Sequence, residues 1–174
     1  RLVDTLDTSP KSADLILALF DLYSTLEDSA SADALVVKAL KRGIGKDDAV
    51  STAMLKMRAA SSAAALGRTE EMPALIAAAE PVFLKDPKRF RYELVDLNLA
   101  KAQLLRRTGK LEDGVKLLVS TIPDAEIAYA EKTRDLMTLY NNTLVYMVEA
   151  NQLAAMPAIF ARAEALMKRT GTES

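Results

Sequence analysis

The sequence predicts an all-α protein arranged as a solenoid of about four helical hairpins. Apolar residues recur with a spacing near 3.6 along almost the whole 174-residue chain, and strand-like alternation is essentially absent. In addition, Gly67, Gly109 and Asn151 each close a similar apolar segment, and successive members of this set are 42 residues apart. A repeat of this length indicates helical hairpins that stack side by side and bury each other's apolar faces.

The composition agrees with closely packed helices and limits the classes of partner that we expect. Half of the residues (50%) are apolar but only 5% are aromatic, so Ala and Leu fill the core. The 23 basic and 24 acidic residues nearly cancel, and we therefore expect no nucleic-acid partner. No apolar run reaches the roughly 18 to 20 residues of a membrane span, so no membrane insertion is expected.

The chain contains neither Cys nor His. A disulfide, a thiolate metal site, the usual general base at neutral pH and the Ser-His or Cys-His pairs are therefore absent. The acidic pairs at 47–48, 70–71 and 112–113 fall at predicted helix starts, where the helix dipole favours negative charge. We expect no enzyme activity, no metal and no cofactor.

The first predicted hairpin covers residues 11–43. Its long helix spans 11–27 with Ser12 as the N-cap, and its short helix spans 33–41 before Gly43. The residues predicted to form the core face of the long helix are Leu15, Ala18, Leu19, Leu22 and Leu26. This hairpin lacks a turn glycine, and the segment beginning at Ser24 is taken as the counterpart of the one beginning at Gly109.

The other three hairpins repeat the alternation of a long and a short helix. Their predicted bounds are 46–85, 87–122 and 124–171. The long helices are predicted at 47–66, 88–107 and 124–150, and the short ones at 69–83, 111–122 and 153–170. Because proline has no N–H and clashes with the preceding turn, we expect Pro81 to kink or shorten its helix and Pro123 to stop its helix.

The residues around the turns resemble the tetratricopeptide-type repeat. The helix containing Ala60, Ala63 and Leu66 ends at Gly67, and Asp86-Pro87 closes the unit, as in that family. The segment 140–144, which leads to Asn151, Phe160 and Ala163, follows the same frame. The resemblance implies one domain over 1–174, a right-handed superhelix whose concave groove is lined by the first helix of each hairpin.

The chain departs from the typical family unit in two ways. The 42-residue period exceeds the usual unit of about 34 residues and resembles a longer variant of the family. The family has a small residue five positions after the turn. Here that position holds the larger Met72 and Met156 in two repeats and a small residue, Gly114, only in the third. A HEAT-like or armadillo-like solenoid, with units of roughly 40 to 47 residues, fits the period equally well.

One subclass of the family holds the carboxylate at the end of a peptide with a clamp of Lys, Arg and Asn. Counting back from each turn, the clamp positions are Met57, Ser61, Ala100, Thr138 and Asn142. Only the last matches a clamp residue type, so the clamp is absent. Met57 and Ser61 remain candidate partner contacts because they lie on the same predicted inner arc, where a methionine suits an adaptable apolar groove but is also common in cores.

Asn142 resembles the groove asparagine with which other members bind a ligand's backbone, since an amide both donates and accepts hydrogen bonds. Gln103 and Arg106, on the inner arc of the preceding long helix, would assist it. Two alternatives stay open. Asn141 and Asn142 could instead satisfy neighbouring backbone groups, and Gln103 with Arg106 could form a solvated face.

The sequence therefore predicts a non-catalytic scaffold that binds a partner helix or extended peptide in its concave groove. The alternatives are a ligand-sensing or peptide-sensing domain of a regulator, a HEAT-like assembly subunit, and self-association through the ends of the array, at Arg1 to Leu6 and at the final helix. Because the chain opens on Arg1 within an amphipathic segment, we expect a piece of a longer protein. A cytoplasmic location is expected.

Overall fold

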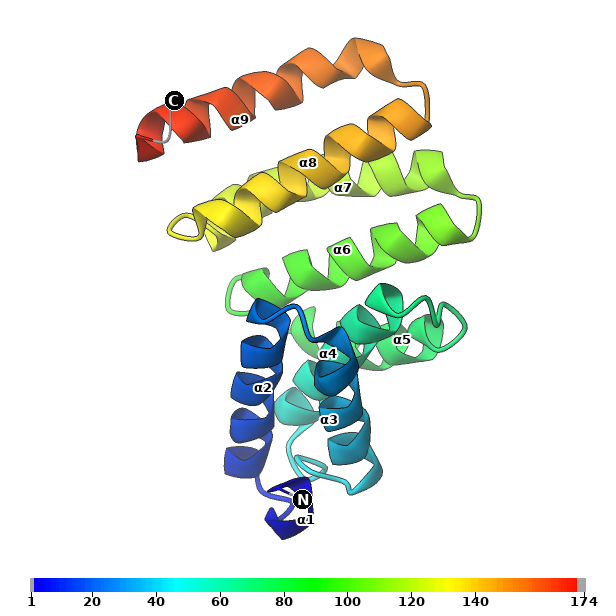
Figure 1. Cartoon of the computed structure of the whole chain (residues 1–174), viewed down its shortest axis with the longest axis vertical. Coiled ribbons are helices and arrows are strands. Elements are labelled where there is room, and N and C mark those ends of the chain that lie inside the picture. Colours follow the sequence, from blue (N-terminus) through cyan, green and yellow to red (C-terminus); the bar gives the residue numbers. More distant parts are fainter. Residues whose placement is uncertain (1, 172–174) are drawn as a thin grey trace. The chain divides into compact units, whose positions relative to one another are not determined.

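The computed structural model describes residues 2–171, so Arg1, part of one predicted array end, lies outside the described residues. The described part is helical and contains no strand, which confirms the all-α prediction (Figure 1). The helices are α1 (Leu2–Thr5), α2 (Pro10–Thr25), α3 (Ser29–Lys41), α4 (Ala49–Ala65), α5 (Met72–Phe83), α6 (Arg91–Arg107), α7 (Leu111–Ala128), α8 (Thr133–Glu149) and α9 (Met156–Thr170), with a 3-10 turn at Leu153–Ala155.

The chain forms two compact units, one up to Ala100 and one from Lys101, and α6 contributes to both. In the first unit, α2 packs against α3 and α4, α3 packs against α4, and α4 packs against α5. In the second unit, α8 packs against both α7 and α9. These three helices run alternately in opposite directions (Figure 1). Helices that neighbour each other in the sequence thus form pairs.

The helix ends at the three repeat positions share one turn geometry, which the ends of α2 and of α3, at Gly43, adopt as well. Gly67, Gly109 and Asn151 are left-handed, with φ of 78°, 77° and 55°, and Glu27 joins them with φ of 58°. After each of these residues, the next N–H donates to the carbonyl five positions earlier, as in a Schellman motif. The four bonds run from Asp28 to Tyr23, Arg68 to Ala63, Lys110 to Leu105, and Gln152 to Met147, at 2.8–2.9 Å.

Glu27 is therefore the turn residue of the first hairpin, and the assignment of Ser24 was wrong. Ser24 lies within α2, as the residue before its last one. The first repeat is 40 residues long, from Glu27 to Gly67, rather than 42. The sequence comparison missed it because a glutamate rarely adopts the left-handed conformation that glycine adopts freely.

The core face predicted for α2 is wrong as well. Leu15, Leu22 and Leu26 are 41%, 53% and 66% exposed, whereas Ile16 and Phe20 are buried. The helix carries two apolar stripes, and the buried one packs in a cluster with residues of α3 and α4 such as Val36 and Leu55. Periodicity finds the stripes but cannot tell which of them the neighbouring helices cover.

The structure also corrects two helix boundaries. Ser9, and not Ser12, caps α2, because the Ser12 N–H donates to the Ser9 Oγ at 3.4 Å and Pro10 occupies the first turn. Pro123 does not stop its helix but lies inside α7, so the fourth hairpin begins with α8 at Thr133 rather than at 124. Ala125 and Tyr129 beyond the proline are buried, and their burial offsets the penalty of about 3 kcal/mol for an interior proline.

Pro81 likewise lies inside α5, which still reaches the predicted end at Phe83. Gly114, the small residue five positions after Gly109, lies at the start of α7. A Cβ there would lie 3.4 Å from the Ala102 carbonyl oxygen and 3.6 Å from the Tyr146 ring. These are ordinary contact distances, so the start of α7 packs closely against its neighbouring helices but leaves room for a Cβ.

Buried charges hold the first unit together. Arg58 of α4 donates to Asp96 of α6 at 2.9 Å and lies 3.1 Å from Asp21 of α2, with its guanidinium over the Phe20 ring. The Arg58 side chain is only 16% exposed, so these partners must compensate for the hydration that its charge loses on burial. Within residues 2–171, no helix is both long and apolar enough to cross a membrane.

Candidate functional site

The structure buries one of the sequence-predicted site residues and half-buries another. Met57 is 1% exposed in the interior of α4, so the prediction that it contacts a partner is contradicted. The Ser61 hydroxyl is half-buried and donates to the Met57 carbonyl at 3.2 Å. The reason is that α4 packs against α2, α3 and α5, which leaves little of its surface open.

Arg106 lies on the surface but already has a partner. Its Nε donates to Oε2 of Glu149 at 2.6 Å, its Nη2 donates to Oε1 of the same carboxylate, and its guanidinium lies 5.2 Å from the Tyr146 ring centroid. The hydrogen bond that Arg106 donates to Glu149 raises the pKa of Arg106 above its usual range. This two-point contact joins the ends of α6 and α8 and fixes the guanidinium in place.

The three remaining predicted residues are amides with free hydrogen-bonding groups. Asn141 is exposed, and Asn142 and Gln103 are half-buried. Within residues 2–171, none of the three side chains forms a hydrogen bond. The interpretation that Asn141 and Asn142 satisfy neighbouring backbone groups therefore has no contact to support it.

Exposed residues recur along one side of α8, and we define the α8 face as Thr138, Asn141, Asn142, Val145 and Val148. Val145 is 40% exposed and Val148 is 55% exposed. The face carries no charge, and the Arg106–Glu149 pair lies at its end. The sequence analysis identified the asparagines but missed the two valines. The spacing of Asn141, Val145 and Val148 is nevertheless that of one helical face.

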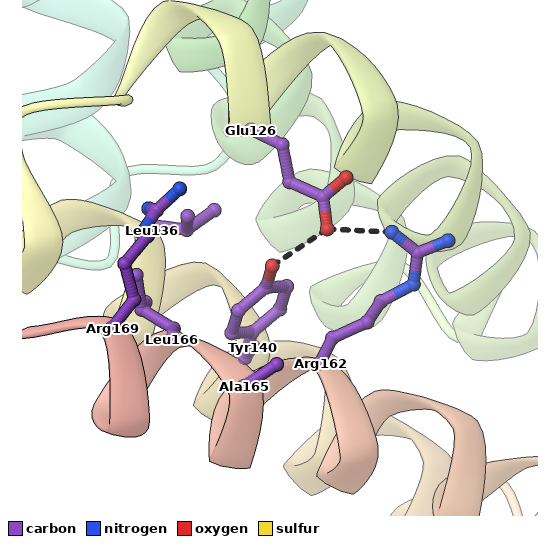
Figure 2. Close-up of a pocket in the computed structure, with 7 residues that line it drawn as sticks. All are labelled: Glu126, Leu136, Tyr140, Arg162, Ala165, Leu166 and Arg169. Atoms are coloured by element: carbon purple, nitrogen blue, oxygen red, sulfur yellow. Dashed lines mark hydrogen bonds and ion pairs between the residues drawn. The ribbon is translucent and has the colours of Figure 1, made fainter.

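A cavity of about 320 Å³ lies among α7, α8 and α9 (Figure 2). The residues that line it are Glu126, Leu136, Tyr140, Arg162, Ala165, Leu166 and Arg169. The Tyr140 hydroxyl donates to Oε1 of Glu126 at 2.7 Å, and Nη1 of Arg162 donates to the same oxygen at 2.5 Å. No motif marked this cavity in the sequence, because its polar residues come from three separate helices.

The bonds inside the cavity set the ionisation of two groups. Partial burial raises the pKa of Glu126, but the hydrogen bonds from Arg162 and Tyr140 outweigh it and bring the pKa below its ordinary value. Burial and the bond to Glu126 both raise the pKa of Tyr140. At neutral pH the cavity therefore holds an ionised Glu126 and a neutral Tyr140.

A second hollow, of about 510 Å³, lies between the turns at Gly109 and Asn151. Its acidic residues Glu112 and Asp113 occupy the first turn of α7, where the helix dipole stabilises them. Across the described residues, no group of three acidic side chains could hold a metal ion. The α8 face and the cavity are therefore the two candidate sites.

The comparisons with known proteins assign neither a family nor a function to the chain. No protein-family model, no curated protein and no solved structure matches the chain.

Proposed function

We propose that the chain is a tetratricopeptide-like, non-catalytic interaction module whose α8 face binds a partner helix or an extended peptide. The observation that carries the proposal is the uncharged strip on α8, where Val145 and Val148 are exposed beside the unbonded amide of Asn142. The matching turns at 27, 67, 109 and 151 support an array of helical hairpins, for which we propose the right-handed superhelix that the family resemblance implies.

The chemistry of the face suits a partner that has both apolar side chains and a polar backbone. The two valines offer apolar contact area, and the amides of Asn141 and Asn142 can both donate to and accept from a main chain. By the repeat spacing, Gln103 is the counterpart of Val145 in the preceding long helix, and we propose that it adds a third amide to the binding surface. The Arg106–Glu149 pair closes one end and holds the two helix ends in register.

An affinity-capture experiment with the full chain as bait tests this proposal. The test variant carries Val145→Gln and Val148→Gln, and the matched control carries Val119→Gln on α7, which is 40% exposed, as is Val145. Because exposed substitutions change stability by about 0.5 kcal/mol or less, all three proteins should melt at similar temperatures. We expect proteins captured by the wild type and the control to be lost from the double variant.

The Asn142→Ala variant separates a binding role from a structural one. If the amide contacts the partner, the variant captures less partner and its melting temperature is unchanged. Retention of the same proteins by wild type, Asn142→Ala and the valine variant would overturn the proposal. Equal loss of capture and of melting temperature would assign Asn142 to the fold.

A second candidate function is the sensing of a small ligand by a regulatory helical domain. The cavity among α7, α8 and α9 favours it, since about 320 Å³ lies within the range of small-molecule sites. The residues that line this cavity differ from those of the α8 face, so the two functions can be tested separately.

A further inference from the structure

The cavity among α7, α8 and α9 has one polar end whose charges are already balanced. Glu126 accepts from Tyr140 and Arg162 through a single carboxylate oxygen, and this arrangement neutralises the Arg162 charge and fixes the three side chains. Figure 2 shows this hydrogen-bonded group on one side of the cavity. A ligand that enters the cavity meets a preorganised polar group there.

Arg169 brings an unbalanced positive charge to the other side. It comes from the last turn of α9, and Figure 2 shows its side chain on the opposite side of the cavity from Arg162. Across the described residues, Arg169 forms no ion pair, whereas Arg162 is paired. The lining of the cavity therefore carries a net charge of one positive unit, because Glu126 is its one acidic residue against Arg162, which bonds to it directly, and Arg169, which acts on it without direct contact.

The wall between the two polar regions is apolar. Leu136 and Leu166 are buried, and Ala165 lies beside them on α9. A ligand that fits must combine one negative charge with a short apolar portion, because burying an unpaired polar group against this wall would cost free energy.

We propose that this cavity is a binding site for a small monocarboxylate with a short aliphatic chain. The carboxylate pairs with Arg169, and the chain lies against Leu136 and Leu166 in the direction of the Tyr140 ring. The site goes beyond the proposed partner binding, because none of its lining residues belongs to the α8 face.

A titration of the full chain by ¹⁵N–¹H NMR, with sodium hexanoate as the probe, tests this inference. We expect saturable shifts in amides of α7, α8 and α9 around the cavity, with a dissociation constant of about 1–10 mM for a ligand of this size. Hexanol and hexylammonium are the matched probes, uncharged and positively charged, and sodium chloride controls for ionic strength. Both should bind at least about fivefold more weakly, because neither has a charge that pairs with Arg169.

Two exposed residues in the same helical turn provide the variant and its control. Arg169→Gln should weaken hexanoate binding about fivefold, whereas Lys168→Gln, whose side chain does not line the cavity, should change it less than twofold. Three results would each overturn the inference: no saturable shift up to about 50 mM hexanoate, equal binding of hexanol or hexylammonium, or equal weakening by both substitutions. Failure of partner capture by the α8 face would leave these results unaffected.

Discussion

Substitution of Glu27 by glycine is expected to stabilise the protein. Glu27 is exposed, has no hydrogen-bonded side-chain partner within the described residues, and adopts φ of 58°, where glycine adopts φ of 77–78° in two equivalent turns. A residue with a Cβ loses about 1–2 kcal/mol in the left-handed conformation. Glycine avoids that cost but loses about 0.4–1 kcal/mol more through the entropy of the unfolded chain. The net expectation is a gain of about 0.5–1 kcal/mol.

Urea denaturation followed by far-UV circular dichroism measures this difference. With a denaturant slope of about 2 kcal/mol per molar, the gain corresponds to a midpoint shift of roughly 0.4 M. Ser24→Gly is the matched control, because Ser24 lies inside α2, where glycine is expected to cost about 0.5–1 kcal/mol. The two substitutions, three residues apart, should thus change stability in opposite directions.

A lower midpoint for Glu27→Gly would refute the reasoning. In that case Glu27 would not be the turn residue, and the first hairpin would leave the register that Gly67, Gly109 and Asn151 share. Asn151→Gly gives a second comparison, and we expect a smaller gain there because asparagine tolerates the left-handed region better than glutamate.

Two further predictions concern acidic residues of the first unit. Asp96→Asn should lower the free energy of unfolding by about 3 kcal/mol, because it leaves the buried Arg58 charge poorly paired. Asp21→Asn should lower it by about 1 kcal/mol or less, because the Asp21 side chain is 59% exposed. Urea denaturation measures both values, and equal losses would contradict this prediction. Hydrogen bonds from the hydroxyls of Ser12 and Ser9 lower the pKa of Asp7 to about 2, so its contribution to stability is complete above pH 3.8 and is lost as the pH falls through about 2. NMR titration of the Asp7 carboxyl should show this pKa, and a value near 3.8 would contradict it.

The helical class and most turns could be predicted from the sequence because they depend on local chemistry. Glycine and asparagine mark left-handed turns, and the predicted end of α4 at Gly67 and of α9 at Gly171 agree with the structure. Asp48 starts α4 as predicted, because a carboxylate accepts a free N–H at a helix N-terminus, here that of Ser51.

The remaining features depend on which surfaces meet, and the sequence does not contain that information locally. Leu22 and Ile16 belong to two apolar stripes of one helix, and only the packing of α3 and α4 decides that Ile16 is buried. Pro123 stops a helix by local rules, yet the buried residues after it keep α7 continuous. The distance from a turn predicts that Met57 lies in a groove, yet it is buried in α4, a helix that packs against three neighbours.

Several arginines of the two units differ in exposure, and both sites that we propose lie in the second unit. In the first unit, Arg58 and Arg68 have side chains that are 16% and 32% exposed, and each bridges helices through aspartates. In the second unit, Arg106 and Arg162 are each 46% exposed, and Arg169 has no ion-pair partner within the described residues. An arginine buried between helices mainly supports the fold, whereas an exposed guanidinium beside an open face or cavity can contact a ligand. Residues from Lys101 onward therefore hold both the α8 face and the carboxylate cavity, and substitutions there should change binding before they change stability.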